Sequence, residues 1–279
     1  MTDPLRPQIT DAQSAPKPVE DSGVWETIKV VLQALAIALV VRTFLFQPFN
    51  IPSGSLVPTL LVGDYLFVSK YAYGYSKHSI PFSPGVFSGR IFGASPKRGD
   101  IAVFKLPRDN ATDYIKRVIG LPGDKIQMID GRLYVNGKLA PREEITPYVA
   151  PDAFGREGPV PTYKETLPDD KMAPGGVTHR IIERDSDRGT LDNTKVFEVP
   201  EGHYFMMGDN RDNSTDSRVP PEATGVGFVP FENLVGRAEI IFFSVKTIPG
   251  PGGDVTEPAW QFWRWPWTVR WDRLFQTVR

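Results

Sequence analysis

The feature that most constrains this chain is an apolar segment near its start, residues 24–46, which reads VWETIKVVLQALAIALVVRTFLF. Its length suits the roughly 20 residues that a helix needs to cross the hydrocarbon core of a bilayer. The Val30–Val41 run is apolar on every side of such a helix except for one glutamine. Lys29 and Arg42 could extend their charged ends towards opposite membrane surfaces. We therefore predict a single transmembrane helix over residues 24–46.

Two other interpretations of this segment compete with a membrane span. A buried or interfacial amphipathic helix would use Glu26, Lys29 and Gln33, which lie on one helical face near the start. A cleaved secretory signal is not favoured, because the apolar run is too long and begins late. Basic residues flank both ends, so charge alone does not set the orientation. Residues 1–23 hold four prolines among polar residues and are predicted to be a disordered tail.

The remainder of the chain favours short strands. Its 27 prolines and 25 glycines mark many turns. Between these turns, six stretches alternate or run apolar, as strands do: DYLFVSKYAYG, DIAVFKL, DYIKRVIG, KIQMIDGRLYVNGK, HYFMMGD and RAEIIFFSV. The Asp-Gly pair in IDGRLYVNG is typical of a two-residue hairpin turn. We therefore expect a mainly β fold after the apolar segment.

The distribution of turns and charges along the chain suggests its domain boundaries. Residues 47–124 and 202–248 are predicted to form one β core, with an apolar hairpin at residues 75–96 that either packs normally or dips into the membrane interface. Residues 125–201, richer in proline and charge, are predicted to be an inserted subdomain. Residues 249–279 mix tryptophan with arginine, which suits either a bilayer interface or a segment docked on the β core.

Composition excludes several kinds of function. The formal net charge of −1 does not favour a nucleic-acid binder held by bulk positive charge. The chain has no cysteine, which excludes disulfides, cysteine catalysis and thiolate metal sites. Its three histidines are scattered, so a metal site or a Ser-His pair would need long-range folding.

Residues 47–64, QPFNIPSGSLVPTLLVGD, place Ser53 and Ser55 between Pro52 and Pro58 directly after the apolar segment. The prolines stiffen the chain and lower the entropy cost of positioning the two hydroxyls. A serine hydroxyl is a poor nucleophile until a neighbouring base takes its proton. Without a suitable histidine, the candidate base is a lysine whose amine is kept neutral by burial.

Lys116 lies inside such an apolar strand, in DYIKRVIGLPGD. Strand alternation puts Lys116 on one face with Tyr114 and Val118, and Arg117 on the other face with Ile115. A strand lysine taken alone is usually a solvated edge residue. The function of Lys116 therefore depends on what folds next to it.

The third polar stretch is GDNRDNSTDSR, residues 208–218. It lacks the glycine and the glutamate that a calcium-binding loop carries at its sixth and twelfth positions. Asp209 with Arg211, and Asp216 with Arg218, could each form a charge-assisted pair that stiffens the loop. The alternative is a solvated turn.

Together these stretches resemble the bacterial type I signal peptidases, or leader peptidases, which are Ser-Lys dyad serine proteases. The family's serine box resembles IPSGSLVPTLLVGD, its lysine box RGDIAVFKLPRDNATDYIKRVIGLPGD, and its last box GDNRDNSTDSR. The resemblance runs from about residue 44 to residue 236, in the right order and behind a predicted membrane span. It implies a membrane-anchored β fold with a catalytic core of antiparallel sheets and an inserted β subdomain.

The resemblance also implies roles for individual residues. Ser55 would be the acylating nucleophile, Lys116 its general base, and Ser53 an oxyanion donor beside the backbone N–H of Ser55. Ser214 would orient the Lys116 amine. Four residues match positions that brace the site: Asp209, Arg211, Asp216 and Arg218. The mechanism needs neither a metal nor a cofactor, and we predict none.

An extended substrate peptide could add alongside the strand 47–55 by backbone hydrogen bonds, with pockets that read alternate side chains. By the resemblance, the pocket for the small residue before the cut would be lined by Ile51, Leu56, Leu60, Tyr114 and Ile115. The pocket two residues upstream would involve Phe49, Leu66 and Val103. Leu56 stands where family members often have methionine, and either side chain would supply an apolar wall.

The expected function is removal of N-terminal signal peptides from secretory preproteins by a monomer. It would sit in the bacterial inner membrane as a single-pass protein, with the catalytic domain on the periplasmic side. Two alternatives stay open at this point: a self-cleaving Ser-Lys protease of the SOS-repressor type, and a non-enzymatic, membrane-anchored β domain that binds partners.

Overall fold

A computed structural model describes residues 23–79, 88–151, 157–169, 175–185, 187–250, 253–256 and 261–279. The chain divides into two compact units, Met1–Leu39 and Val40–Arg279. The predicted disordered tail, residues 1–23, lies outside the described residues apart from Gly23, where the first helix begins.

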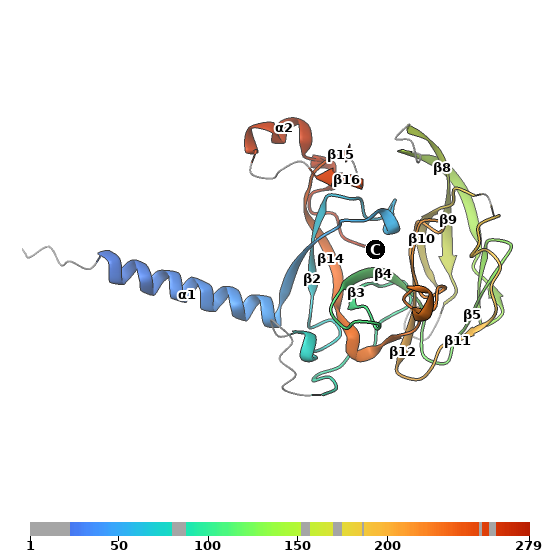
Figure 1. Cartoon of the computed structure of the whole chain (residues 1–279), viewed down its shortest axis with the longest axis horizontal. Coiled ribbons are helices and arrows are strands. Elements are labelled where there is room, and N and C mark those ends of the chain that lie inside the picture. Colours follow the sequence, from blue (N-terminus) through green and yellow to red (C-terminus); the bar gives the residue numbers. More distant parts are fainter. Residues whose placement is uncertain are drawn as a thin grey trace, which may run out of the picture. The chain divides into compact units, whose positions relative to one another are not determined.

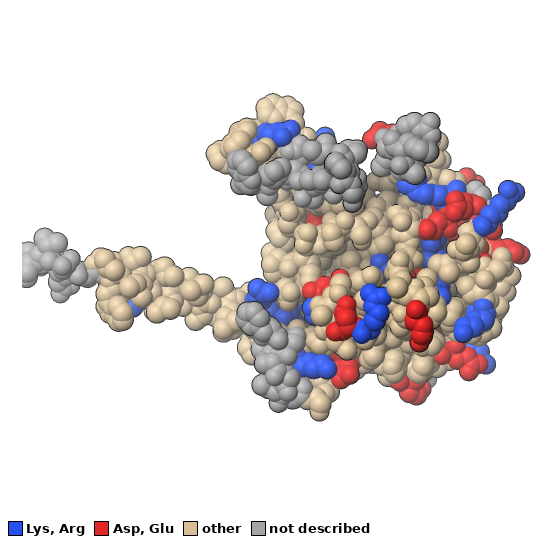
Figure 2. Space-filling view, in the orientation of Figure 1, with Lys and Arg blue, Asp and Glu red and all other residues tan. Residues whose placement is uncertain are grey.

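Helix α1 (Gly23–Phe44) is long and apolar enough to cross a membrane. It has 22 residues and a mean hydropathy of 1.9, and none of its residues is buried. Apolar side chains surround α1 rather than forming one stripe, which argues against the amphipathic alternative. In Figure 2 its surface is almost entirely tan, whereas blue and red side chains are spread over the β unit. The structure ends the helix two residues before the predicted boundary, because Phe46 already begins a strand.

The largest sheet among the described residues has seven strands, all paired antiparallel. In spatial order they are β1 (Phe46–Asn50), β2 (Asp64–Ser69), β14 (Leu234–Ser244), β3 (Ile101–Lys105), β4 (Asp113–Gly120), β12 (His203–Met207) and β13 (Val229–Pro230). Register shifts interrupt β12 and β14, and such irregularities bend and twist a sheet. The sheet is therefore curled, as Figure 1 shows, and the predicted β fold is confirmed.

Residues 125–198 form two further antiparallel sheets. One contains β11 (Phe197–Glu198), β5 (Lys125–Ile129), β6 (Arg132–Val135) and β7 (Lys138–Leu139); the other contains β10 (Val177–Ile182), β9 (Glu157–Leu167) and β8 (Arg142–Pro151). The predicted Asp-Gly turn joins β5 to β6, with φ of 47° at Asp130 and 70° at Gly131. Positive φ at both positions is what a type I′ turn requires.

Both faces of the seven-stranded sheet are covered, which strand β3 illustrates. Ile101 and Val103 join one buried cluster, while Ala102 and Phe104 join another. Successive side chains on a strand point to opposite faces, so β3 is buried on both sides. A third cluster packs β12 residues such as Phe205 against the β5–β6 hairpin of the inserted region. The insert therefore shares a core with the main sheet.

The C-terminal region returns to the main sheet. Thr277 pairs with Ile240 of β14, and the Phe275 N–H donates to the Ile241 carbonyl at 2.7 Å. The docked alternative is therefore correct for the end of segment 249–279. The hairpin β15 (Thr247–Gly250) and β16 (Gly253–Thr256) and the short helix α2 (Trp265–Thr268) precede this part of the chain (Figure 1). We call residues 269–279 the C-terminal strap. Among the described residues of the region, five aromatic side chains are exposed: Phe262, Trp263, Trp267, Trp271 and Phe275.

The ends of the predicted apolar hairpin 75–96 are paired. Tyr75 and Ile91 exchange two backbone hydrogen bonds of 2.9 and 2.8 Å. Phe92 is 85% exposed beside this pair. Residues 80–87, the predicted tip, lie outside the described part of the chain.

Candidate active site

The serine-bearing segment forms a tight turn at the end of edge strand β1, and we call residues 51–56 the serine turn. Ile51 is fixed by hydrogen bonds with Asp64 and Gly63, and the 3-10 helix Gly54–Leu56 follows. Ser53 is extended and exposed, whereas Ser55 is buried. The turn thus keeps one hydroxyl accessible and presents the other inward.

The turn and strand β4 bring two predicted site residues together. Lys116 Nζ donates a hydrogen bond to Ser55 Oγ at 2.5 Å. Lys116 is 4% exposed, and its Nζ lies 5.5 Å from the centre of the Tyr114 ring on the same strand face. Among the described residues Lys116 forms no ion pair. Its amine is therefore buried against a hydroxyl rather than against a carboxylate.

These surroundings lower the pKa of Lys116 from its usual 10.5 to about 8. Burial is the largest cause, because it penalises the charged ammonium. The carboxylates of Asp216 and Asp209 raise the pKa, and the Arg218 guanidinium lowers it. A substantial fraction of the amine is thus neutral near pH 8, in contact with a hydroxyl that it can deprotonate.

Ser53 approaches the Ser55 hydroxyl from the exposed side of the serine turn. Its Oγ lies 3.5 Å from Ser55 Oγ. A hydroxyl there is placed next to any carbonyl carbon that Ser55 attacks, which is where an oxyanion donor is needed. The described structure places Ser53 for this role, and the role itself stays a prediction.

Loop 208–218 packs next to the Ser55–Lys116 pair. Asp216 accepts two hydrogen bonds of 2.9 Å from Arg218, as the sequence predicted, and one of 3.1 Å from the Gly208 N–H. Burial alone would raise the pKa of the Asp216 carboxyl, but the Arg218 guanidinium outweighs burial and the pKa is lowered. The buried Ser214 hydroxyl contributes to the same lowering. No hydrogen bond joins Ser214 to Lys116 among the described residues, so its orienting role stays a prediction.

The other expected pair of this loop, Asp209 with Arg211, is wrong. Asp209 instead accepts from Arg117 at 2.8 and 2.7 Å and from Thr59 at 2.6 Å. Arg211 forms a bidentate pair with Glu165 of β9. Asp209 and Arg211 are two positions apart in the loop, but each side chain pairs with a residue from a different part of the fold. Spacing along the loop could not reveal those partners.

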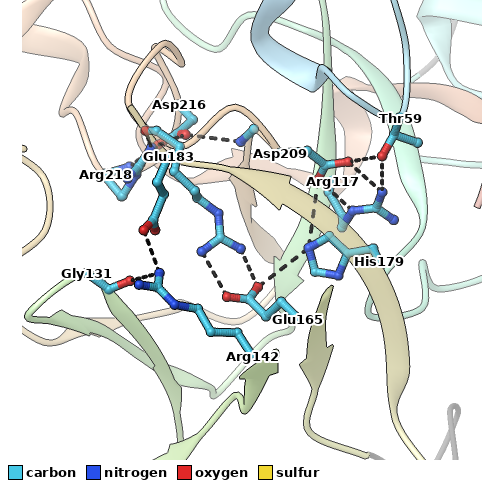
Figure 3. A network of polar contacts seen from close by, with 12 residues as sticks. Thr59, Arg117, Gly131, Arg142, Glu165, His179, Glu183, Asp209, Asp216 and Arg218 are labelled. Atoms are coloured by element: carbon cyan, nitrogen blue, oxygen red, sulfur yellow. Dashed lines mark hydrogen bonds and ion pairs between the residues drawn. The ribbon is translucent and has the colours of Figure 1, made fainter. Parts of the chain in front are cut away.

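Figure 3 shows the resulting network of buried charges. His179 of β10 lies between Glu165 and Asp209, at 3.5 and 3.8 Å. Burial holds the pKa of His179 well below 6.5, so the ring is neutral. Arg142 of β8 pairs with Glu183 at 2.6 Å. The insert is thereby tied to the loop that carries Asp209, and no histidine lines the cleft beside Ser55.

Two residues that sequence reasoning missed hold the serine turn directly. The Asn210 N–H donates to the Ser55 carbonyl at 3.1 Å, and its Nδ2 donates to the Gly54 carbonyl at 3.0 Å. A Cβ at Gly208 would lie 2.5 Å from the Ser55 carbonyl oxygen, so only glycine fits there. Asn210 lies between two residues that were selected, but nothing in its sequence position separates a backbone clamp from a solvated amide.

The predicted pocket residues lie near the serine turn, but most of them are buried. Seven of them join one hydrophobic cluster: Phe49, Ile51, Leu56, Leu60, Leu66, Val103 and Ile115. Tyr114 belongs to the cluster on the other sheet face. Of the eight, Tyr114 and Ile115 line the cleft. The remaining residues of the eight that are fully buried could form only the base of a substrate pocket.

The cleft beside the pair has a volume of about 620 Å³. Its walls come from the serine turn, the start of β4 and loop 208–218. Ser53, Ser55 and Lys116 all line it. No group of three His, Asp or Glu side chains that could hold a metal occurs among the described residues.

Comparison with known proteins identifies the family. Residues 24–243 match the family described as signal peptidase, peptidase S26. A protein named Signal peptidase I from Rickettsia prowazekii is 47% identical over 220 residues, which cover 76% of this chain and 77% of that protein. Its namesake from Rickettsia typhi is 46% identical over the same shares. The one from Rickettsia canadensis is 45% identical over 230 residues, 80% of each chain. The chain belongs to the signal peptidase family S26.

Proposed function

We propose that this protein is a membrane-bound serine endopeptidase that removes N-terminal signal peptides from exported preproteins. The observation that carries the proposal is the 2.5 Å contact between Ser55 Oγ and the buried Lys116 Nζ. The family match does not favour a self-cleaving regulatory protease or a non-enzymatic binding domain.

In the proposed mechanism the neutral Lys116 amine takes the Ser55 proton while Oγ attacks the scissile carbonyl carbon. The developing oxyanion accepts hydrogen bonds from the Ser53 hydroxyl and the Ser55 N–H. The Lys116 ammonium then returns its proton to the leaving amine as the C–N bond breaks, which leaves an acyl ester on Ser55. Lys116 next activates a water molecule, whose attack releases the signal peptide and regenerates the dyad.

Strand β1 suits the binding of an extended substrate. It is the outer strand of its sheet and pairs with β2 alone among the described strands. A peptide lying along the turn that follows β1 would meet Pro52 and Ser53 on one side and Tyr114 and Ile115 on the other. We expect small side chains next to the scissile bond, as cleavage sites of secretory signals have.

We further propose that α1 spans the bacterial inner membrane once, with the β unit on the periplasmic side as a monomer. Its substrates are held in the same bilayer by their own apolar segments, and sharing a surface raises the effective concentration. The exposed aromatic residues 262, 263 and 267, close to Arg264, support a lipid contact.

The function is tested with a purified preprotein and with the full-length enzyme in detergent or vesicles. Wild type should cleave once, after the small-residue site, and Ser55→Ala should not cleave. Ser88→Ala, which changes an exposed serine outside the cleft, serves as the matched control and should keep full activity. Cleavage by Ser55→Ala at the wild-type rate would refute the proposed nucleophile.

Sidedness is tested separately. Because the chain has no cysteine, a single cysteine introduced at the exposed Lys138 can be labelled selectively. A membrane-impermeant maleimide should label Lys138→Cys in intact spheroplasts. Labelling only after lysis would place the β unit on the cytoplasmic side and contradict the proposal.

A further inference from the structure

A second hollow lies beside the serine turn, in addition to the cleft that contains the Ser55–Lys116 pair. Its volume is about 500 Å³, a size typical of ligand pockets. Residues of the serine turn and of the chain after it form one wall, and Tyr148, Val149 and Ala150 of β8 form another. Lys246, Thr247 and Arg270 line it from the end of β14 and the C-terminal strap. We call it the second hollow.

The second hollow adjoins the cleft. Gly54 and Asn213 line both of them. A chain that lies in the cleft can therefore continue over Gly54, which carries no side chain, into the second hollow. On that path it meets Asn210, whose buried Oδ1 accepts no hydrogen bond from a described residue.

The direction of the substrate chain follows from connectivity. Strand β1 starts at Phe46, directly after α1 ends at Phe44, and runs to the serine turn. The apolar part of the substrate is held in the same bilayer as α1. Substrate residues before the scissile bond therefore lie on the β1 side of Ser55. The residues after the scissile bond must leave on the other side, over Gly54 and Asn213.

The two spaces differ in charge. Among the described residues, three cationic side chains, Arg184, Lys246 and Arg270, and one carboxylate, Glu157, line the second hollow. The cleft is lined by two carboxylates, Asp113 and Asp212, and by Lys116. Lys246 is exposed, and its ammonium forms no ion pair with a described residue. Arg270 donates to the Val62 carbonyl at 2.9 Å and lies 3.8 Å from the Asp64 carboxylate, so its position is fixed at the wall and its charge is partly offset.

We propose that the second hollow binds the first few residues of the exported chain, those that follow the scissile bond, and that Lys246 and Arg270 select acidic side chains among them. This inference rests on the proposed function, because it assigns the part of the substrate that the cleft does not hold. Lys246 is the main determinant of this selection, since its charge is not neutralised by a protein carboxylate.

The test uses three preproteins that are identical up to the cleavage site and through the first residue after it. The second to fourth residues after the site are aspartates, asparagines or lysines. With wild type, kcat/KM should fall in the order Asp, Asn, Lys, with about 5-fold between the extremes, as one partly solvated charge pair allows. Raising the salt concentration should shrink this ratio.

Lys246→Glu should remove or reverse the preference for the aspartate substrate over the lysine substrate. The matched control is Lys138→Glu, the same charge change at an exposed residue that lines neither space; it should keep the wild-type order. Equal rates on all three substrates, or an unchanged order in Lys246→Glu, would overturn the inference while Ser55-dependent cleavage still supported the function. Absence of cleavage of every substrate would instead count against both.

Discussion

Lys116 and Arg117 are neighbours on β4, and the two faces of that strand place their charges in opposite surroundings. Lys116 meets the Ser55 hydroxyl at 2.5 Å and forms no ion pair with a described residue. Arg117 is fully buried and makes two hydrogen bonds, of 2.8 and 2.7 Å, to Asp209. The amine on one face thus has no carboxylate hydrogen-bonded to it among the described residues, whereas the guanidinium on the other face is paired with one.

This difference in charge pairing suits Lys116 to a reactive role and Arg117 to a structural role. Burial without a counter-charge lowers the pKa of Lys116 to about 8, so the amine can give up its proton. A guanidinium paired in bidentate geometry keeps its charge and fixes the position of its partner. Asp209 precedes Asn210, the loop residue whose N–H donates to the serine turn. In the proposed mechanism Arg117 therefore acts on the site by fixing positions, and Lys116 acts by proton transfer.

Replacing Lys116 gives the largest expected effect. Lys116→Met should lower kcat for preprotein cleavage by about 10²- to 10⁴-fold or more, since the general base is lost. Lys116→Arg should be equally inactive, because a guanidinium is effectively never neutral. Both variants should keep the wild-type circular dichroism spectrum. A Lys116→Arg enzyme with near-normal kcat would eliminate the general-base assignment.

The matched change on the other face, Arg117→Met, should act on stability. It leaves the Asp209 carboxylate buried without its partner, which should lower the free energy of unfolding by about 3–5 kcal/mol. Lys116→Met should not destabilise the fold, because it removes a cation that is costly to bury. Urea unfolding of both variants measures the contrast. Equal destabilisation by the two substitutions would break the comparison between the faces.

Ser53→Ala should have the next largest effect. Loss of one oxyanion donor typically lowers kcat by about 10²- to 10³-fold. Ser53 is exposed, so the free energy of unfolding should stay unchanged. Ser53→Thr keeps a hydroxyl at this position and provides the control. Wild-type kcat in Ser53→Ala would remove Ser53 from the site.

The smallest effect is the pH dependence. The reactive form of Lys116 is the neutral one, so kcat/KM should rise with pH along a single limb whose midpoint is near 8. Below the midpoint the rate should fall about tenfold per pH unit. The unfolded chain binds more protons than the folded one between about pH 8 and the usual 10.5, so this lysine should also make stability rise with pH across that window. An activity profile that is flat from pH 6 to pH 10 would contradict the lowered pKa.

Much of the fold could be predicted from local signals. The apolar run gave α1, the Asp-Gly pair gave the β5–β6 turn, and the alternating stretches gave the strands of the main sheet. These signals are local, because side-chain periodicity and positive φ depend on neighbours in sequence. The position of the C-terminal strap could not be predicted, since its aromatic and arginine residues suit lipid and protein surfaces equally well.

The candidate site was predicted unevenly for the same reason. Ser55, Lys116 and the Asp216–Arg218 pair lie in recognisable stretches, and the structure brings them together. The partners of Asp209 and Arg211 were wrong, because Arg117 and Glu165 approach from strands 92 and 46 residues away in sequence. Asn210 was missed because its function depends on a backbone carbonyl of the serine turn.

By itself, the sequence determined which segments are apolar, where strands turn, and which hydroxyl and amine are available for chemistry. Those properties depend on single residues and on the spacing of apolar residues along short stretches. Only the tertiary structure decided which cation stays unpaired and which is neutralised, and which hollow adjoins the serine turn. Charge pairing and burial depend on distances across the whole fold, and the lowered pKa of Lys116 therefore arises only once the serine turn and loop 208–218 are packed against β4.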